Sequence, residues 1–165
     1  MHRYRCRNTA MVTTAAPAFV ATGTTIKTML QIATPSTRQC QLIAWGFDLD
    51  APQAGTVELL QTDVAATVTA HVAAGIQPLD PNAPASLLVG GATATGFTAS
   101  GEGVVTTTRS WDTVRITGTT ATAILSYNYQ WMPDERPIVA VSRFLRVRVT
   151  FGSTTNMLCW VVWDE

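Results

Sequence analysis

The feature that most constrains the fold of this chain is an alternation of apolar and polar side chains with a period of two. In the segment 25–33, TIKTMLQIA, one side of the alternation holds Ile26, Thr28, Leu30 and Ile32. Successive side chains of a β-strand point to opposite faces of a sheet, so this pattern predicts a half-buried strand. No segment has the 3.6-residue period of an amphipathic helix with comparable clarity. The chain is therefore predicted to be built from strands.

The composition also favours strands. Thr accounts for 27 of the 165 residues, whereas Lys27 is the sole lysine. Thr is β-branched and stiff at χ1, which suits a pleated surface better than a helix interior. Charged residues make up 13% of the chain, about half of the ~25% typical of soluble domains. A surface with so few ions is typical of a protein held against another protein, because interfaces are depleted in Lys, Glu and Asp.

Turn signals divide the chain into about nine or ten short predicted strands. Besides 25–33, the candidates are 39–50, 56–62, 66–74, 103–109, 112–117, 121–132, 137–141 and two segments within 144–165. The segment 39–50 is apolar on both faces, with Cys40, Leu42 and Ala44 on one and Ile43, Trp45 and Phe47 on the other, which predicts a central strand. We expect an all-β fold, an antiparallel β-sandwich that is jelly-roll-like, with an up-and-down barrel as the alternative.

The domain organisation follows from the length and from one change in composition. A chain of 165 residues matches a single domain. We expect residues 1–24 to form an N-terminal arm and a first strand, and 25–165 to form one β-sandwich domain. Within it, residues 75–103 hold three prolines and six of the 11 glycines. This excursion is predicted to be mostly loop, with a short strand or helical turn near 87–89 and the rest against a neighbour or the parent sheet.

The C-terminal stretch 144–165 alternates arginines with aliphatic residues and then ends on Trp, Val and two carboxylates. It predicts an antiparallel hairpin around GSTTN, residues 152–156. The expected inward side chains are Leu145, Val147, Val149 and Phe151, whereas Arg146 and Arg148 are expected to point outward and pair with Asp164 and Glu165, of this chain or of a neighbouring subunit. For the last strand the pattern does not decide which face is buried in the core. The two alternatives are Leu158, Trp160 and Val162, or Cys159, Val161 and Trp163.

The sequence holds no recognisable catalytic constellation. The two histidines, His2 and His71, stand alone, and His71 is predicted to be a face residue of a strand. A cupin-type metal site needs a closely spaced histidine pair, and a Ser or Cys nucleophile needs a base within reach. Asp48 and Asp50 at a predicted strand end lack the oxygen-rich loop of a calcium site, and no two carboxylates are predicted to face each other across a cleft. We therefore expect a non-enzymatic protein with no catalytic, cofactor or metal site.

Charge and cysteine usage limit the partners and the compartment. Acidic and basic residues balance at 11 each, for a net charge of +0, so no long-range field attracts nucleic acid or an anionic membrane. The three cysteines, Cys6, Cys40 and Cys159, are a poor disulfide framework and are expected to be free thiols. The N-terminal segment is too weakly apolar for a secretory signal, and no run of residues is long and apolar enough for a membrane span.

Several pieces of the chain resemble small proteins encoded among the structural genes of tailed bacteriophages. The pieces are TIKTMLQIATPSTRQCQLIAWGFDLD, GTVELLQT, GEG, YQWMPDERPIVAVSRFLRVRV and CWVVWDE, which together span residues 25–165. The resemblance is to head decoration (cement) or head-fibre proteins. It implies a β-sandwich that binds the major capsid protein on the outer shell, often as a homotrimer. It also implies a location on the virion surface after assembly in the host cytoplasm.

Six residues are candidates for protein contacts: Arg3, Arg5, Arg7, Trp131, Arg146 and Arg148. In an extended N-terminal arm the first three would form one cationic edge facing an acidic capsid surface. The alternative function is a carbohydrate- or receptor-binding module of a phage fibre or tail, because aromatic faces stack on sugars. The side chains that favour it are Trp111, Tyr127, Tyr129 and Trp131.

Overall fold

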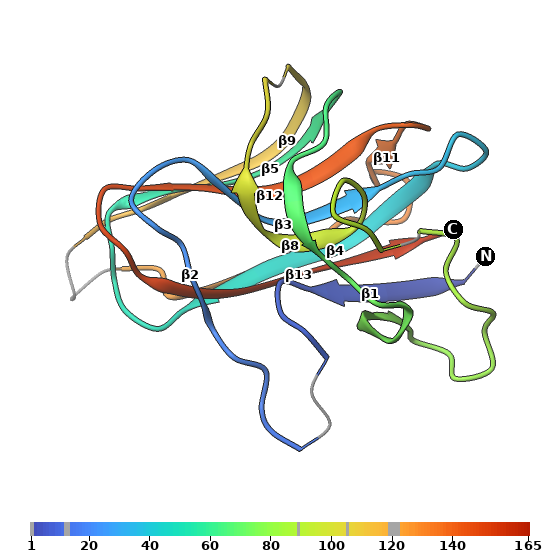
Figure 1. Cartoon of the computed structure of the whole chain (residues 1–165), viewed down its shortest axis with the longest axis horizontal. Helices are drawn as coiled ribbons and strands as arrows, with labels where there is room; N and C mark the ends of the chain where they lie inside the picture. The colour runs from blue at the N-terminus through green and yellow to red at the C-terminus, as the bar shows by residue number, and fades with distance from the viewer. Residues whose placement is uncertain (1, 12–13, 89, 105, 119–122) are drawn as a thin grey trace.

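The computed structural model describes residues 2–11, 14–88, 90–104, 106–118 and 123–165. It is an all-β molecule in which the described residues form strands and one short 3-10 helix (Figure 1). The strands are β1 (Arg3–Arg7), β2 (Val20–Ala21), β3 (Lys27–Ala33), β4 (Cys40–Leu49), β5 (Gly55–Thr62), β6 (Thr67–Ala70), β7 (Ile76–Pro78), β8 (Gly96–Gly101), β9 (Thr107–Ile116), β10 (Ser126–Gln130), β11 (Ile138–Val139), β12 (Phe144–Phe151) and β13 (Asn156–Asp164), and the helix is η1 (Ala73–Gly75).

Two antiparallel sheets pack face to face, which confirms the predicted β-sandwich. Sheet A runs β10-β4-β13-β1-β7, with β11 beside β4 and β2 beside β13, and sheet B runs β6-β8-β3-β12-β5-β9. Eight of these strands, ordered β1-β13-β4-β10 and β3-β12-β5-β9, have the connectivity of a jelly roll, in which two Greek keys wind across two four-stranded sheets. β4 is central, as predicted, and the open sheets exclude the barrel alternative.

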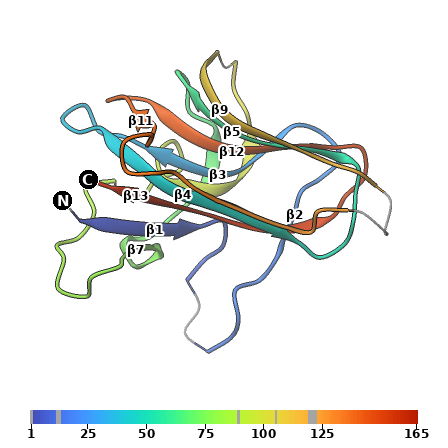
Figure 2. The same cartoon turned by 180° about the vertical axis from the view of Figure 1, so that it is seen from behind.

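The N-terminal residues belong to sheet A, and β1 is a strand within residues 1–24, the segment expected to form an arm and a first strand. β1 pairs with β13 on one side and β7 on the other, and Tyr4 and Cys6 are each 1% exposed (Figure 2). The backbone of His2 also pairs with Glu165, so the two ends of the chain lie side by side. Alternation predicted the extended conformation of residues 3–7, but not the strands on both sides of it. The sandwich therefore begins at Arg3, within that segment.

The Pro/Gly-rich excursion is more ordered than predicted. β7 extends sheet A, whereas β8 pairs with β3 and β6 and extends sheet B. A Cβ on Gly96 would lie 2.4 Å from the carbonyl oxygen of Thr69, so glycine is what allows β8 to approach β6. Bends at residues 87 and 88 replace the predicted strand or helical turn, and residue 89 lies outside the described residues.

The predicted C-terminal hairpin is wrong. β12 pairs with β3 and β5 in sheet B, whereas β13 pairs with β1, β2 and β4 in sheet A. Residues 152–155 thus carry the chain from one sheet to the other. The predicted inward face of β12 is confirmed, since Leu145, Val147, Val149 and Phe151 are at most 2% exposed. On β13 the core face is Cys159, Val161 and Trp163, each 0% exposed.

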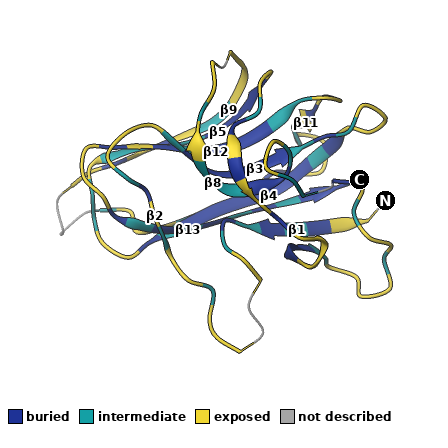
Figure 3. Cartoon of the chain, viewed as in Figure 1, coloured by how far each residue is buried: buried dark blue, intermediate teal, exposed yellow. Residues whose placement is uncertain are grey.

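A β-bulge changes the predicted faces of β4. Val162 pairs with Ala44 and Trp163 with Leu42, so Ile43 is the extra residue on the bulged strand. Leu42 and Trp45 consequently both join the core, although simple alternation put them on opposite faces. Figure 3 shows both sheets buried at the centre of the molecule, and the side chains that form the core cluster there are apolar.

Candidate functional site

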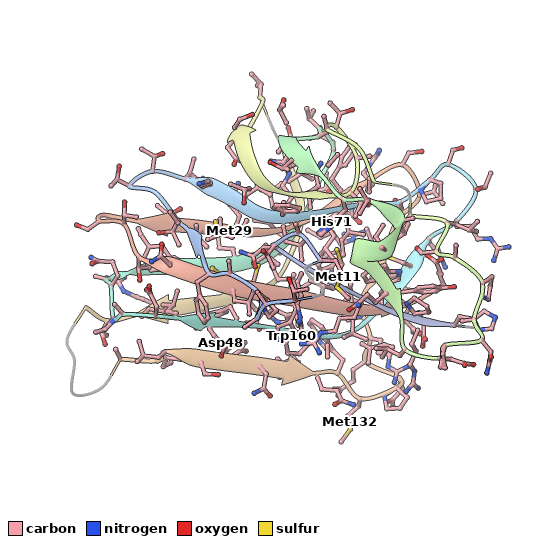
Figure 4. The ribbon with its side chains drawn as sticks, turned by 60° about the horizontal axis from the view of Figure 1, so that its bottom comes forward. Met11, Met29, Asp48, His71, Met132 and Trp160 are labelled. Atoms are coloured by element: carbon pink, nitrogen blue, oxygen red, sulfur yellow. The ribbon has the colours of Figure 1, made fainter. Side chains whose placement is uncertain are left out.

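The histidine and cysteine side chains are occupied in packing. His71 follows β6, is 5% exposed, and places its Nε2 atom 2.6 Å from the carbonyl oxygen of Arg7 (Figure 4). Burial lowers the pKa of His71, which keeps the ring neutral. Cys6, Cys40 and Cys159 are free and buried, and burial raises the pKa of all three thiols, so none is an accessible nucleophile.

No metal-binding group was found in the part of the chain that the structure describes: no three His, Cys, Asp or Glu side chains there lie close enough to hold an ion. Asp50 instead caps the turn before β13. It accepts hydrogen bonds from the backbone N–H and the Nδ2 of Asn156 and from the hydroxyl of Thr155, and the Asn156 bonds lower the pKa of this carboxyl. Among the described residues, no helix has the length and apolar character that a bilayer span requires.

The aromatic side chains predicted to form a binding platform are mostly tied into the fold. Trp131 is 8% exposed and joins the core cluster, which corrects its assignment as a surface contact. The hydroxyl of Tyr127 donates to Asp112 at 2.7 Å, and the indole N–H of Trp45 donates to the same carboxylate at 3.1 Å. Burial and the Asp112 hydrogen bond raise the pKa of Tyr127. Tyr129 is exposed, but its ring packs edge-on against Trp131.

Arg146 is the largest departure from the predicted surface contacts. Its side chain points away from the core, as expected for the outer face of sheet B. It is nevertheless 0% exposed, because the segments around Val64 and Glu102 cover it. The guanidinium Nη1 lies 3.0 Å from the Glu102 carboxylate, and Nη2 donates to the carbonyl oxygen of Val64. The same carboxylate accepts the hydroxyl proton of Thr28 at 2.6 Å. Arg146 is therefore a structural residue.

The predicted pairing of the outward arginines with the C-terminal carboxylates is also wrong. Arg148 pairs across the strands with Glu58 at 3.1 Å. Asp164 pairs with Arg136 at 3.3 Å and with Arg3 at 3.6 Å. The Glu165 carboxylate accepts hydrogen bonds from Ser86, Leu87 and the indole of Trp163. Of the candidate arginines, Arg5 and Arg7 are the two that have no carboxylate within 4.0 Å among the described residues.

These two arginines lie on the outer face of sheet A beside Trp160. Arg7 is the cross-strand partner of Trp160, and the guanidinium carbon of Arg5 lies 4.7 Å from the centre of the indole. On the other side of the indole, a Cβ at Gly46 would lie 2.7 Å from the ring, so the ring lies against the sheet because residue 46 is glycine. We call this arrangement of Arg5, Trp160 and Gly46 the arginine–tryptophan stack.

A shallow polar hollow of about 310 Å³ adjoins the stack. Its polar lining comes from Asp48 on β4 and from Ser126, Asn128 and Gln130 on β10, and Trp160 also lines it. Figure 4 places Asp48 and Trp160 beside β10. The hollow offers one carboxylate, one hydroxyl and two amides to a ligand, without the paired acid and base that a hydrolytic mechanism needs.

Next to the hollow lies an exposed apolar border, which we call the β10–β11 edge. Among the described residues it contains six large apolar side chains that are 39–65% exposed: Ile124, Leu125, Tyr129, Met132, Ile138 and Val141. Met132, the most exposed of them, projects away from the body of the molecule (Figure 4). β10 and β11 both flank β4, so this border follows one side of sheet A. Exposed apolar side chains along one border of a sheet are candidates for an interaction site.

The sequence indicated part of this surface. Alternation placed Arg3, Arg5 and Arg7 on one face, but the role of Trp160 depended on which face of β13 is buried, and the pattern left that open. Gly46, in the middle of the predicted central strand, is the signal that could have pointed to a close approach to the backbone there.

A scan of the chain against protein-family models found no match, and searches of curated proteins and of solved structures found none either. The fold and the surface chemistry therefore carry the functional argument.

Proposed function

We propose that this chain is a non-enzymatic virion structural protein, a decoration or stabilising protein that binds the outer surface of a tailed-phage head. Its partners are the major capsid protein and other copies of itself, as a trimer. It is assembled in the host cytoplasm and stays on the capsid surface. The observation that carries the proposal is the row of exposed apolar side chains along the β10–β11 edge, on the same sheet whose outer face carries Arg5 and Arg7.

This surface suits binding to a protein more than catalysis. Interface cores favour aromatic residues, Met and Arg, and the outer face of sheet A with its β10–β11 edge presents Trp160, Met132 and Arg5. Jelly rolls serve as capsid and lectin domains, which agrees with the role. A contact of standard size buries ~1,600 Å² in total, and repetition around a symmetric shell turns modest affinities into firm attachment.

Binding to mature heads of the phage that carries the gene tests the proposal. We expect the purified chain to co-sediment with the heads at a fixed ratio of copies per capsid protein. Met132→Asp and Ile138→Asp place a charge on the exposed β10–β11 edge and should lower occupancy, because desolvating an unpaired charge is costly. Val104→Asp is the control, since residue 104 is 96% exposed and lies outside sheet A. Native mass spectrometry should record a trimer.

Absence of co-sedimentation by the wild-type chain would overturn the proposed function. Equal occupancy of Met132→Asp, Ile138→Asp and Val104→Asp would move the contact away from the β10–β11 edge.

The polar hollow favours a second candidate function, a carbohydrate-binding module of a phage fibre or tail. Asp48, Asn128 and Gln130 offer the carboxylate and amide groups that bind sugar hydroxyls, and Trp160 provides an aromatic ring. A glycan array tests this candidate directly. A signal that Asn128→Ala abolishes would support it, whereas a silent array from a chain that binds heads would exclude it.

A further inference from the structure

The arginine–tryptophan stack lacks a negative charge. Arg5 and Arg7 are two positions apart on β1, so both point to the outer face of sheet A. Neither pairs with a carboxylate among the described residues, whereas Arg3, on the same face, pairs with Asp164. The Nε atom of Arg5 is buried and has no hydrogen-bond partner. The Nε atoms of Arg136 and Arg146 are in the same state, but each of those guanidinium groups pairs with a carboxylate, whereas Arg5 pairs with none of the carboxylates that the structure describes.

The position of the Arg5 guanidinium is fixed before any partner arrives. One of its faces lies over the Trp160 ring at 4.7 Å, and the ring itself rests on Gly46. Stacking on an indole stabilises the cation and leaves the terminal Nη donors of the guanidinium free to bind in its plane. The Arg5 side chain is therefore ordered before binding, so a partner does not have to supply the entropic cost of ordering it.

The neighbouring groups add positive charge. Burial and the nearby charge of Arg7 lower the pKa of Arg5, which indicates two cations close together without an anion between them. Gln77, the cross-strand partner of Arg5 on β7, contributes an uncharged amide. An anion at this place would relieve the repulsion between the two arginines.

We propose that the Arg5–Trp160 stack binds a carboxylate from an acidic side chain of the partner protein, with Arg7 as the second cation. A planar carboxylate accepts two parallel N–H bonds from one guanidinium, which the two terminal Nη groups of Arg5 can supply. A nucleic-acid backbone requires cations repeated along its length, and a chain with a net charge of +0 supplies no such track. The apolar β10–β11 edge on the same sheet favours a protein as the source of the carboxylate over a sugar acid. This inference rests on the proposed function.

The Nε–H resonance of Arg5 reports on the site directly by NMR. It is assigned by its disappearance in Arg5→Lys, which keeps the positive charge but removes the fork. We expect a hexaglutamate peptide to shift this resonance in a saturable and salt-sensitive way. Arg109, on β9 of sheet B, provides the matched control, because Arg109→Lys should leave the Arg5 titration unchanged. Trigalacturonic acid and inorganic phosphate, titrated separately, represent the sugar-acid and free-phosphate sources and should shift it far less.

Each outcome decides the assignment. No saturable shift with hexaglutamate, or a larger shift with trigalacturonic acid or phosphate, overturns the protein carboxylate as the ligand. On phage heads, Arg5→Lys should bind about tenfold more weakly than Arg109→Lys, the equivalent of about one charge-assisted hydrogen bond. Equal binding overturns the carboxylate site and leaves the proposed function intact. Failure of the wild-type chain to bind heads overturns the proposed function, while the peptide titration still decides whether the stack takes a carboxylate.

Discussion

Removing the charge of Glu102 is the most direct test of the buried ion pair over sheet B. Arg146 is 0% exposed and Glu102 is 19% exposed, so Glu102→Gln leaves a guanidinium buried without its counter-charge. Breaking a buried pair on one side costs ~3–5 kcal/mol. We expect Glu102→Gln to lower the unfolding free energy by about 3 kcal/mol. This value is at the lower end of the range because water reaches part of the Glu102 carboxylate.

The neighbouring pair on the same strand provides the control. Arg148 is 14% exposed and its partner Glu58 is 24% exposed, so Glu58→Gln should cost about 1 kcal/mol. A double variant, Arg146→Met with Glu102→Gln, removes the buried cation as well. Its loss of unfolding free energy should be smaller, by ~0.5–3 kcal/mol, than the sum of the losses in the two single variants, because the two residues are in contact.

Urea unfolding measures these differences. With a slope of roughly 2 kcal/mol/M, a loss of about 3 kcal/mol lowers the midpoint by about 1.5 M. The slope itself should stay constant, as for a loss of stability without a change in the surface exposed on unfolding. Equal midpoints for Glu102→Gln and Glu58→Gln would refute the reasoning, because the Arg146 guanidinium would then be hydrated.

Three further predictions test the core and the outer face of sheet A. Trp163→Ala should lower the unfolding free energy by about 3–5 kcal/mol, because the Trp163 ring is in the core. Trp160→Ala should lower it by about 1 kcal/mol, because the Trp160 ring lies outside the core under Arg5. Equal urea midpoints for the two variants would contradict the assigned faces of β13. Gly46→Ala should cost about 1–3 kcal/mol in the same assay, because its Cβ would lie 2.6 Å from the carbonyl oxygen of Tyr127, and an unchanged midpoint would mean that the backbone yields freely. Because burial lowers the pKa of His71, the unfolded chain takes up a proton first as the pH falls below about 6.5. The unfolding free energy of the wild-type chain should therefore fall between pH 7 and pH 5 more steeply than that of His71→Gln. Identical pH profiles would show that His71 has the same pKa in the folded and the unfolded chain.

The sequence predicted the fold class well because alternation is a local property. The inward face of β12 follows from a period of two, and so does the common face of Arg3, Arg5 and Arg7. Register and partner strands are not local, since a strand with the same alternation pairs equally well within a hairpin or across a sandwich. For this reason β12 and β13 were assigned to one hairpin, although they lie in different sheets.

The candidate site depended on features that alternation does not carry. The bulge at Ile43 changes which residues of β4 face the core, and a bulge is set by the pairing of two strands. Arg146 was predicted to be exposed because it lies opposite the core face, but the pattern within β12 says nothing about the segments that cover it. Trp160 lies on the outer face of sheet A because Cys159, Val161 and Trp163 form the inner face of β13. Which face of β13 is the inner one depends on its pairing with β1 and β4.

A reconstruction by electron cryo-microscopy of mature phage heads incubated with the purified chain tests the central claim most directly. The account predicts extra density at regular positions on the outer shell, with the jelly roll docked through the outer face of sheet A and the β10–β11 edge. Bare heads at saturating protein would contradict the proposed function. Density with sheet B against the shell would contradict the assigned contact surface.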